Sequence, residues 1–323
     1  MSFSRVIGHD KEVAYFKHLV KEEKLPHAIM LEGRQGVGKM TLGHQLVKSI
    51  FCDTKSGDAC GICRHCVKFE HDNHPDFLLI EPDGTQIKNA QIEAFQEFIH
   101  IKPYDGLYKV VIIREADKMN ASSQNRILKT LEEPPAHIIV IMLTTNSESL
   151  LPTVLSRCQI IKLNGLHHAL VLDYMKKNLD SSDEVIAKLA DGSIGRAVEY
   201  ITSDQFEQIR SHTESILLAI NSKEKSKILG ELSYFSSEKE NIQSILDYMI
   251  LWYRDIMLFK QAKAKHLLIH SESVDFIKKL ARNLSLKKII QNIEVIEATK
   301  KKLKQHGHFD LTIEVMLIRL LED

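Results

Sequence analysis

Net charge is absent from this chain of 323 residues, because 43 lysine and arginine side chains balance 43 aspartate and glutamate side chains. No overall field therefore draws the molecule onto nucleic acid or an anionic membrane, and any contact with DNA must be local or shared with partners. Long apolar runs are also absent, since none approaches the roughly 18 residues that span a bilayer. Residues 1–5 lead directly into charged side chains, so the sequence predicts no membrane segment and a reducing cytoplasm.

One of the two side chains that hold magnesium in a P-loop ATPase is missing from the loop itself. A glycine-rich turn contains Gly33, Gly36 and Gly38 and is followed by Lys39. Such a turn wraps phosphate with its backbone N–H groups, and the following helix adds its positive end. The next residue should carry a hydroxyl group for Mg²⁺. It is Met40, and a thioether does not bind a hard cation.

The second magnesium ligand is missing as well. The strand expected at residues 108–113 should be followed by an aspartate, but Arg114 and Glu115 stand there. A fixed positive charge close to Lys39 repels a metal ion, and Thr41 comes one place too late, because one residue turns a helical side chain by about 100°. The sequence predicts weak or absent ATP and Mg²⁺ binding without hydrolysis, with the Arg114 guanidinium either meeting phosphate or pairing with Glu115 or Asp117.

Cysteine is scarce, and four of the five cysteines are concentrated in one segment. Cys52, Cys60, Cys63 and Cys66 have the spacing C-x7-C-x2-C-x2-C. Four thiolates at this spacing can surround a tetrahedral zinc ion, and a reducing compartment gives them little use as disulfides. We expect a structural zinc module over residues 52–66 with no open position for catalysis; ordinary buried cysteines are the alternative.

Apolar strands alternate with helical segments in the first half of the chain. The expected strands cover residues 27–31, 76–81, 108–113, 137–144 and 159–163. This alternation predicts an α/β P-loop domain over 1–165, a parallel sheet flanked by helices, with ligands at the carboxyl ends of the strands. Helical periodicity follows, and predicts a small helical lid over 166–203 and an all-helical domain over 204–323.

Two arginines stand where a positive charge could act on phosphate. Arg157 belongs to the triplet Ser156-Arg157-Cys158 in a loop beside the last strand. Its spacing leaves a functional role and an ordinary solvated or ion-paired role about equally open. Arg196 begins a lid helix, where a phosphate sensor and a surface charge are the alternatives.

A dense basic run covers residues 300–304, with His306 and His308 close behind. Aromatic side chains, which stack on bases in single-stranded nucleic-acid sites, are not interleaved with it. A solvated helix face is therefore favoured over a DNA contact.

Together these features resemble the bacterial clamp-loader branch of the AAA+ family. The resemblance covers essentially the whole chain and rests on the four-cysteine insert, the segments 121–135 and 311–320, and the triplet around Arg157. Tau/gamma subunits of that branch share most of these features but keep an intact metal-binding loop. Met40, Arg114 and a chain that ends after the third domain favour a subunit that has lost hydrolysis and is not an enzyme on its own.

The resemblance implies roles that spacing leaves open. In this family the arginine of the triplet crosses a subunit boundary as an arginine finger, so Arg157 is expected to act in trans on ATP held by a tau/gamma subunit. The third domain is expected to be a collar that holds five subunits in an open ring. The implied partners are tau/gamma and delta subunits and, indirectly, the sliding clamp and primer-template DNA.

Two alternatives remain at this point. In an active ATPase switch of the tau/gamma kind, Glu115 polarises water and Thr41 or another carboxylate recruits Mg²⁺. In a zinc-dependent nucleic-acid-binding module, the affinity for DNA is sensitive to salt. The balanced charge of the chain disfavours this second alternative.

Overall fold

The computed structural model describes residues 3–239, 241–262, 267–305 and 308–322. The chain divides into two compact units. The first runs to Tyr174 and includes Asp191–Arg196; the second comprises Met175–Ala190 and the chain from Ala197 onward. The boundaries of the three expected domains, 1–165, 166–203 and 204–323, stay a prediction.

A parallel five-stranded sheet forms the centre of the first unit, with the strand order β2-β3-β4-β1-β5. The strands are β1 (Ala28–Gly33), β2 (Phe77–Ile80), β3 (Lys109–Ile113), β4 (Ile138–Thr144) and β5 (Gln159–Leu163). Each lies within two residues of its predicted position. Every residue of β3 and β4 is buried, as expected for parallel strands covered on both faces.

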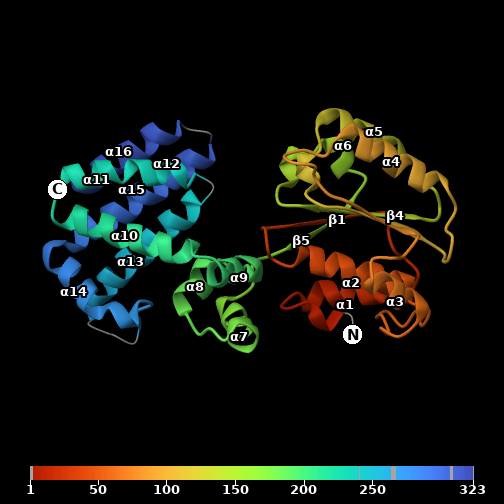
Figure 1. Cartoon of the computed structure of the whole chain (residues 1–323), viewed down its shortest axis with the longest axis horizontal. Coiled ribbons are helices and arrows are strands. Elements are labelled where there is room, and N and C mark those ends of the chain that lie inside the picture. Colours follow the sequence, from red (N-terminus) through yellow and green to blue (C-terminus); the bar gives the residue numbers. More distant parts are fainter. Residues whose placement is uncertain (1–2, 240, 263–266, 306–307, 323) are drawn as a thin grey trace. The chain divides into compact units, whose positions relative to one another are not determined.

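Helices cover both faces of this sheet (Figure 1). One face carries α1 (Asp10–Lys21), α2 (Lys39–Phe51) and α3 (Arg64–Glu70); the other carries α4 (Asn89–His100), α5 (Ala121–Glu132) and α6 (Pro152–Leu155). Because side chains alternate along a strand, Met30 and Val111 enter the core beside α4 and α5. Ile29 and Ile112 enter the core beside α1 and α2. The sheet thus separates two apolar cores.

Short helices complete the first unit and lead out of it. They are the 3-10 helices η1 (Phe3–Arg5), η2 (Ala116–Lys118) and η3 (Ser147–Ser149), and the helices α7 (His168–Asn178), α8 (Glu184–Leu189) and α9 (Ile194–Thr202). Side-chain caps explain where several helices begin. The Asn120 carboxamide accepts the Ser123 N–H at 2.8 Å before α5, and the Asp183 carboxylate accepts the Val185 N–H at 2.7 Å before α8.

Among the described residues of the second unit, all the regular elements are helices. Its further elements are α10 (Gln205–Asn221), α11 (Lys225–Gly230), α12 (Leu232–Ser237), α13 (Ile242–Ala262), η5 (Ser271–Ser273), α14 (Val274–Asn283), α15 (Leu286–Lys304) and α16 (Phe309–Leu321). Helix α13 packs against α10, α14 and α15, and its side chains Trp252 and Tyr253 are fully buried. The sheet and this helical half confirm the predicted fold class.

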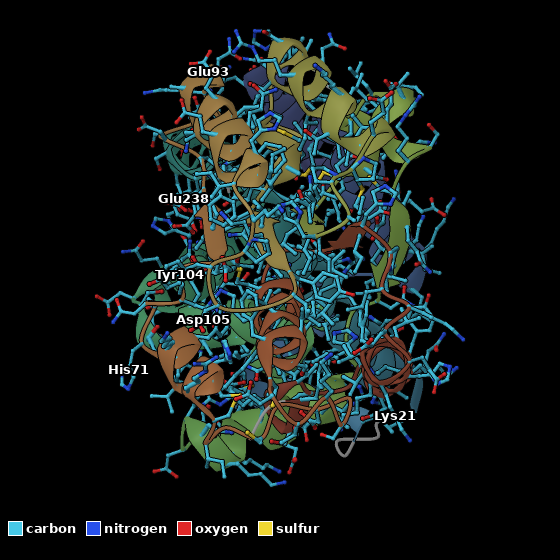
Figure 2. The ribbon with its side chains drawn as sticks, turned by 90° about the vertical axis from the view of Figure 1, so that its right-hand side faces the viewer. Lys21, His71, Glu93, Tyr104, Asp105 and Glu238 are labelled. Carbon is cyan, nitrogen blue, oxygen red and sulfur yellow. The ribbon has the colours of Figure 1, made fainter. Side chains whose placement is uncertain are left out.

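The surface of the first unit is rich in charged side chains. Lys21 at the end of α1 and Glu93 on α4 both project outward (Figure 2). In the part of the chain that the structure describes, no helix combines the length and the apolar character that crossing a membrane requires.

Candidate functional site

The glycine-rich turn between β1 and α2 borders a cavity of about 750 Å³. Residues that follow β1, β3 and β4 line this cavity, so it lies at the carboxyl ends of the strands, as predicted. Gly36 and Gly38 have φ values of +70° and +110°, a backbone conformation that favours glycine. Gly38 also caps α2, whose positive end therefore faces the turn.

The amine of Lys39 is folded back onto the turn. It donates hydrogen bonds to the carbonyl oxygens of Gly33 at 2.5 Å and Arg34 at 2.7 Å. Burial lowers the pKa of Lys39 to about 8, and the nearby carboxylates of Asp117 and Glu115 offset only part of this effect. The lysine thus stands among backbone oxygens and two acidic groups on one side of the cavity.

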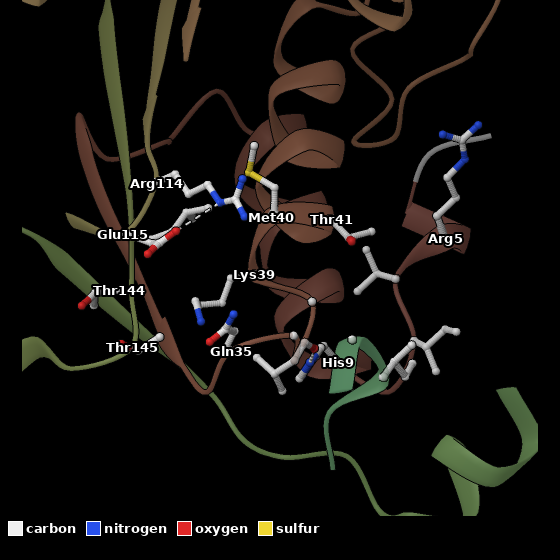
Figure 3. Close-up of a pocket in the computed structure, with 18 of the residues that line it drawn as sticks. Arg5, His9, Gln35, Lys39, Met40, Thr41, Arg114, Glu115, Thr144 and Thr145 are labelled. Carbon is white, nitrogen blue, oxygen red and sulfur yellow. Dashed lines mark hydrogen bonds and ion pairs between the residues drawn. The ribbon is translucent and has the colours of Figure 1, made fainter. Parts of the chain in front are cut away.

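Met40 and Arg114 both line this cavity (Figure 3). The Arg114 Nη1 lies 2.6 Å from the Glu81 Oε1, and its Nε lies 3.6 Å from the Glu115 Oε1. The pairing of Arg114 with a neighbouring carboxylate is one of the two predicted outcomes, but Glu81 was missed as its partner. Thr41 projects to the side of α2 away from Arg114 (Figure 3), as its one-residue offset predicts.

Asp117, the other carboxylate predicted as a partner of Arg114, contacts Thr144 and Thr145, which sequence reasoning missed. The Asp117 Oδ1 accepts hydrogen bonds from the Thr144 hydroxyl at 2.7 Å and from the Thr145 N–H at 3.1 Å. All three residues line the cavity. The available signal was the pair of hydroxyl residues at the carboxyl end of the strand predicted at 137–144, Thr144 and Thr145.

The beginning of α9 packs directly on the glycine-rich turn. The Ser193 hydroxyl donates to the Gln35 carbonyl at 2.9 Å, and the Gly195 N–H donates to the Gly36 carbonyl at 3.0 Å. A Cβ atom at Gly36 would lie 2.4 Å from the Ser193 Oγ and 3.2 Å from the Arg196 backbone nitrogen. The structure therefore brings Arg196 next to the turn, while its role as a phosphate sensor stays a prediction.

The four clustered cysteines come together in space. The sulfur atoms of Cys52, Cys60, Cys63 and Cys66 all lie within 4.8 Å of one another. A tetrahedral site with Zn–S bonds of about 2.3 Å has sulfur-to-sulfur distances of about 3.8 Å. The backbone N–H of Cys60 donates to the Cys52 sulfur at 3.2 Å. The backbone N–H of Cys63 donates to the Cys60 sulfur at 3.3 Å. The donor set and these bonds suit thiolates that hold a metal ion.

The cysteine thiols differ in acidity. Backbone N–H groups of Ile62 and Cys63 lower the pKa of Cys60 to about 6, whereas burial raises the pKa of Cys66. A metal ion deprotonates the thiols that it binds. Cys158 stands apart: it packs against the core beside α5 and α6, and burial raises its pKa to about 12.

Ion pairs and a histidine pair connect α3 to the segments that precede β2 and β3. Asp105, labelled in Figure 2, lies 3.0 Å from the guanidinium of Arg64 and 2.5 Å from the amine of Lys68. Both basic residues belong to α3. His65 Nδ1 and His74 Nε2 are 3.0 Å apart. Burial lowers the pKa of His74 to about 4, so this histidine is neutral in the folded protein at pH 7.

Arg157 follows α6 and contacts residues of its own chain. Its Nη2 lies 2.8 Å from the Glu132 Oε1 at the end of α5, and its Nη1 donates to the Thr153 carbonyl at 2.8 Å. Among the described residues, those that line the cavity beside Gly36 do not include Arg157. The structure thus separates Arg157 from the glycine-rich turn of the same chain.

The basic run on α15 is partly neutralised. The amine of Lys300 contacts the carboxylate of Asp247 and lies 3.5 Å from Glu297. His308 caps α16 by accepting the Leu311 N–H at 3.4 Å, and His306 lies outside the described residues. Lys300 is thus paired within the chain, while the solvated helix face favoured for the rest of the run stays a prediction.

The chain matches two family models. One, described as DNA polymerase III, delta subunit, covers residues 8–167, and the other, for the C-terminal part of the same subunit, covers residues 204–322. DNA polymerase III subunit delta' of Bacillus subtilis is 30% identical over 94% of this chain and 93% of the relative. DNA polymerase III subunit gamma of Buchnera aphidicola is 27% identical over 100% of this chain and 96% of the relative.

The comparison with solved structures gives weaker similarity. A DNA polymerase III gamma subunit-related protein from Thermotoga maritima superposes with a TM-score of 0.44 and 17% identity, covering 96% of this chain and 98% of that protein. The assignment therefore depends on the two family models and on the delta' relative. Because these matches extend over most of its length, the chain belongs to the DNA polymerase III delta subunit family, which includes the delta' subunit of Bacillus subtilis.

Proposed function

We propose that the chain is a delta' subunit of a bacterial clamp loader that does not hydrolyse ATP. It helps load the sliding clamp onto primed DNA and supplies Arg157 in trans to the ATP site of a neighbouring tau/gamma subunit. The observation that carries this proposal is the presence of Met40 and Arg114 in the cavity beside the glycine-rich turn. A thioether and a guanidinium there do not coordinate Mg²⁺ in the way that a hydroxyl and a carboxylate do.

The surroundings of Arg157 support its role in trans. The side chain retains 33% of its exposure and lies outside the cavity of its own chain. A guanidinium suits this role because its rigid planar fork of N–H donors matches the oxygens of phosphate. An arginine finger contributes roughly 10³ to 10⁵ in rate, or about 4 to 7 kcal/mol of transition-state stabilisation.

We also propose that the four clustered cysteines hold a structural zinc ion. Cys52, Cys60, Cys63 and Cys66 supply a complete tetrahedral donor set, so no position stays open for a reacting water. The zinc would order the segment between α2 and α3 and would take no part in ATP chemistry.

The second unit supports the proposed assembly with tau/gamma and delta subunits. Several apolar side chains on α15 and α16 are exposed, among them Ile290 at 46%, Leu311 at 57% and Ile318 at 45%. Helices α15 and α16 pack against each other, and exposed apolar side chains on them are available to bind another protein. We assign these two helices to the collar of the ring, and a cytoplasmic location follows from the proposed replication partners.

The test is to reconstitute the complex with tau/gamma and delta subunits and replace Arg157 with alanine. We expect an unchanged complex mass and a lower rate of DNA-stimulated ATP turnover, because one ATP site loses a charge that stabilises its transition state. The exposed Arg282, replaced with alanine, is the control for the loss of a positive charge.

Two results would count against this proposal. Unchanged turnover in the Arg157→Ala complex would show that the role in trans is wrong. Hydrolysis by the isolated chain that is abolished by Lys39→Ala would instead favour an active ATPase of the tau/gamma kind.

A further inference from the structure

Glu132 contacts the guanidinium that the proposed function assigns to a neighbouring ATP site. We propose that Glu132 is a positioning residue: its carboxylate orients the Arg157 guanidinium before the neighbouring subunit presents ATP. The inference rests on the proposed role of Arg157 in trans. Its starting point is the distance of 2.8 Å between the Glu132 Oε1 and the Arg157 Nη2.

Residues of α5 and of the segment at α6 contact the two terminal nitrogens of the guanidinium. Glu132 is the last residue of α5, which packs against α6. On the other terminal nitrogen, Nη1 donates to the Thr153 carbonyl at 2.8 Å and to the Ser156 hydroxyl at 3.3 Å. Because Nη1 and Nη2 are both bonded, the plane of the guanidinium is fixed relative to α5 and α6. A guanidinium has five N–H donors, so donors remain for phosphate oxygens.

The exposure of the pair determines what the contact can do. The side chains of Arg157 and Glu132 are 33% and 49% exposed. An ion pair this open to solvent adds little to the stability of the chain. It does restrict the rotamers of a long side chain, and a group that is ordered in advance loses less entropy when it binds. The contact should therefore affect turnover at the neighbouring site more than folding.

The chain offers a matched control in the next residue. Glu133 caps the end of α5, is exposed, and carries the same charge as Glu132. Replacing either residue with alanine removes one negative charge from the same helix end. Only Glu132→Ala removes the carboxylate that contacts Arg157, so a difference between the two variants isolates that contact.

The test is a double-mutant cycle in the complex reconstituted with tau/gamma and delta subunits. Arg157-dependent turnover is defined as the DNA-stimulated ATP turnover of the wild-type complex minus that of the Arg157→Ala complex. We expect Glu132→Ala to lower this quantity roughly 3- to 10-fold, the size typical of contacting residues that are energetically coupled. The ATP concentration that gives half-maximal turnover should stay within about twofold of the wild-type value. The reason is that the Arg157 guanidinium is proposed to stabilise the transition state rather than bound ATP.

Further variants separate positioning from a structural effect. Glu132→Gln keeps an oxygen acceptor at the same distance and should retain at least about half of the Arg157-dependent turnover. Glu133→Ala should retain nearly all of it. In the Arg157→Ala background, Glu132→Ala should cause no further loss, because the group that it positions is gone.

The outcomes distinguish this inference from the proposed function. If Arg157→Ala leaves turnover unchanged, both are wrong. If Arg157→Ala lowers turnover but Glu132→Ala does not, or raises it, the role of Arg157 stands and the positioning role of Glu132 is wrong. A loss from Glu132→Ala that is equally large without Arg157 also overturns the inference, because the effect then bypasses the guanidinium.

Discussion

Two side chains carry the proposal that the cavity beside the glycine-rich turn does not hold magnesium. Met40 offers a soft sulfur, and Arg114 forms an ion pair with Glu81 at the position where a metal-binding carboxylate is required. In the proposed function, the Arg114 guanidinium takes the place of the divalent ion that an ATPase holds there. Because the proposed loss of magnesium binding depends on these two residues, substituting them should reverse it.

We predict that the double variant Met40→Ser, Arg114→Asp gains Mg²⁺-dependent ATP binding. It restores a hydroxyl and a carboxylate, and it leaves Glu81 in need of a cation. Calorimetric titration should show affinity at least about tenfold higher with Mg²⁺ than with EDTA, a difference of about 1.4 kcal/mol.

Wild-type protein and the charge-conserving variant Arg114→Lys are the controls for this experiment. Both should bind ATP weakly and with the same affinity in Mg²⁺ and in EDTA. Tight binding by the wild-type chain that collapses on addition of EDTA would contradict the loss of the magnesium site.

His74 predicts how stability depends on pH. It is buried, its ring stacks on Phe51 at a centroid distance of 3.8 Å, and burial lowers its pKa from 6.5 to about 4. Between pH 6.5 and pH 4 the unfolded chain takes up a proton that the folded chain does not, so the free energy of unfolding falls as the pH falls, by at most about 3 kcal/mol.

The measurement is urea unfolding of wild-type protein and His74→Phe from pH 7.5 to pH 4. We expect the wild type to lose stability relative to the variant between pH 6.5 and pH 4, and to level off when the series is extended to pH 3. Release of zinc by acid affects both proteins, so their difference reports His74 together with its buried partner His65. Parallel curves for the two proteins would show that His74 does not cause the acid sensitivity.

At the scale of elements, the contact between the glycine-rich turn and α9 is a close approach of two backbones. A Cβ atom at Gly195 would lie 2.7 Å from the Gly36 Cα. Gly195→Ala should therefore lower the free energy of unfolding by about 1 to 3 kcal/mol, as overpacking does. Gly230→Ala is the control, because a Cβ atom there meets nothing within 4 Å.

Urea unfolding of the two glycine variants tests this contact. In α11, alanine in place of Gly230 should be neutral or stabilise the protein by up to about 1 kcal/mol. Equal stability of the two variants would mean that the turn and α9 separate without cost, and that the contact does not hold the turn in its observed conformation.

The sequence predicted each strand of the sheet to within two residues. Buried parallel strands form continuous apolar runs, and helical segments between them mark their ends. The partner of Arg114 was out of reach, because Glu81 and Arg114 are 33 residues apart and become neighbours only through the pairing of β2 with β3. The contact of Arg157 with Glu132 likewise depends on the packing of α5 against α6.

At the scale of the whole molecule, each of the two units contains a group whose state can be measured separately. Trp252, the single tryptophan of the chain, is fully buried in α13 of the second unit, whereas the cysteine cluster belongs to the first. A structural zinc ion contributes about 10 to 16 kcal/mol in small peptides, so its loss should unfold the segment that it orders. The second unit should not respond.

We predict that the purified reduced protein contains about one zinc ion per chain. A strong chelator should remove it and open residues 52–66 to protease, while the thermal transition seen by Trp252 fluorescence shifts by less than about 2 °C. Cys63→Ser should lose zinc, and Cys158→Ser should keep it. Zinc-free wild-type protein would refute the site, and a large shift of the Trp252 transition would refute the independence of the units.

By itself, the sequence determined which chemical groups are available. It places four thiols within 15 residues, removes a hydroxyl and a carboxylate from the positions that bind magnesium, and alternates strands with helices in the first half only. These are local properties, because spacing along the chain is enough to define them. The tertiary structure alone decided which groups meet. Strand order joins Arg114 to Glu81, and helix packing joins Arg157 to Glu132, because contacts between distant segments depend on the arrangement of whole elements.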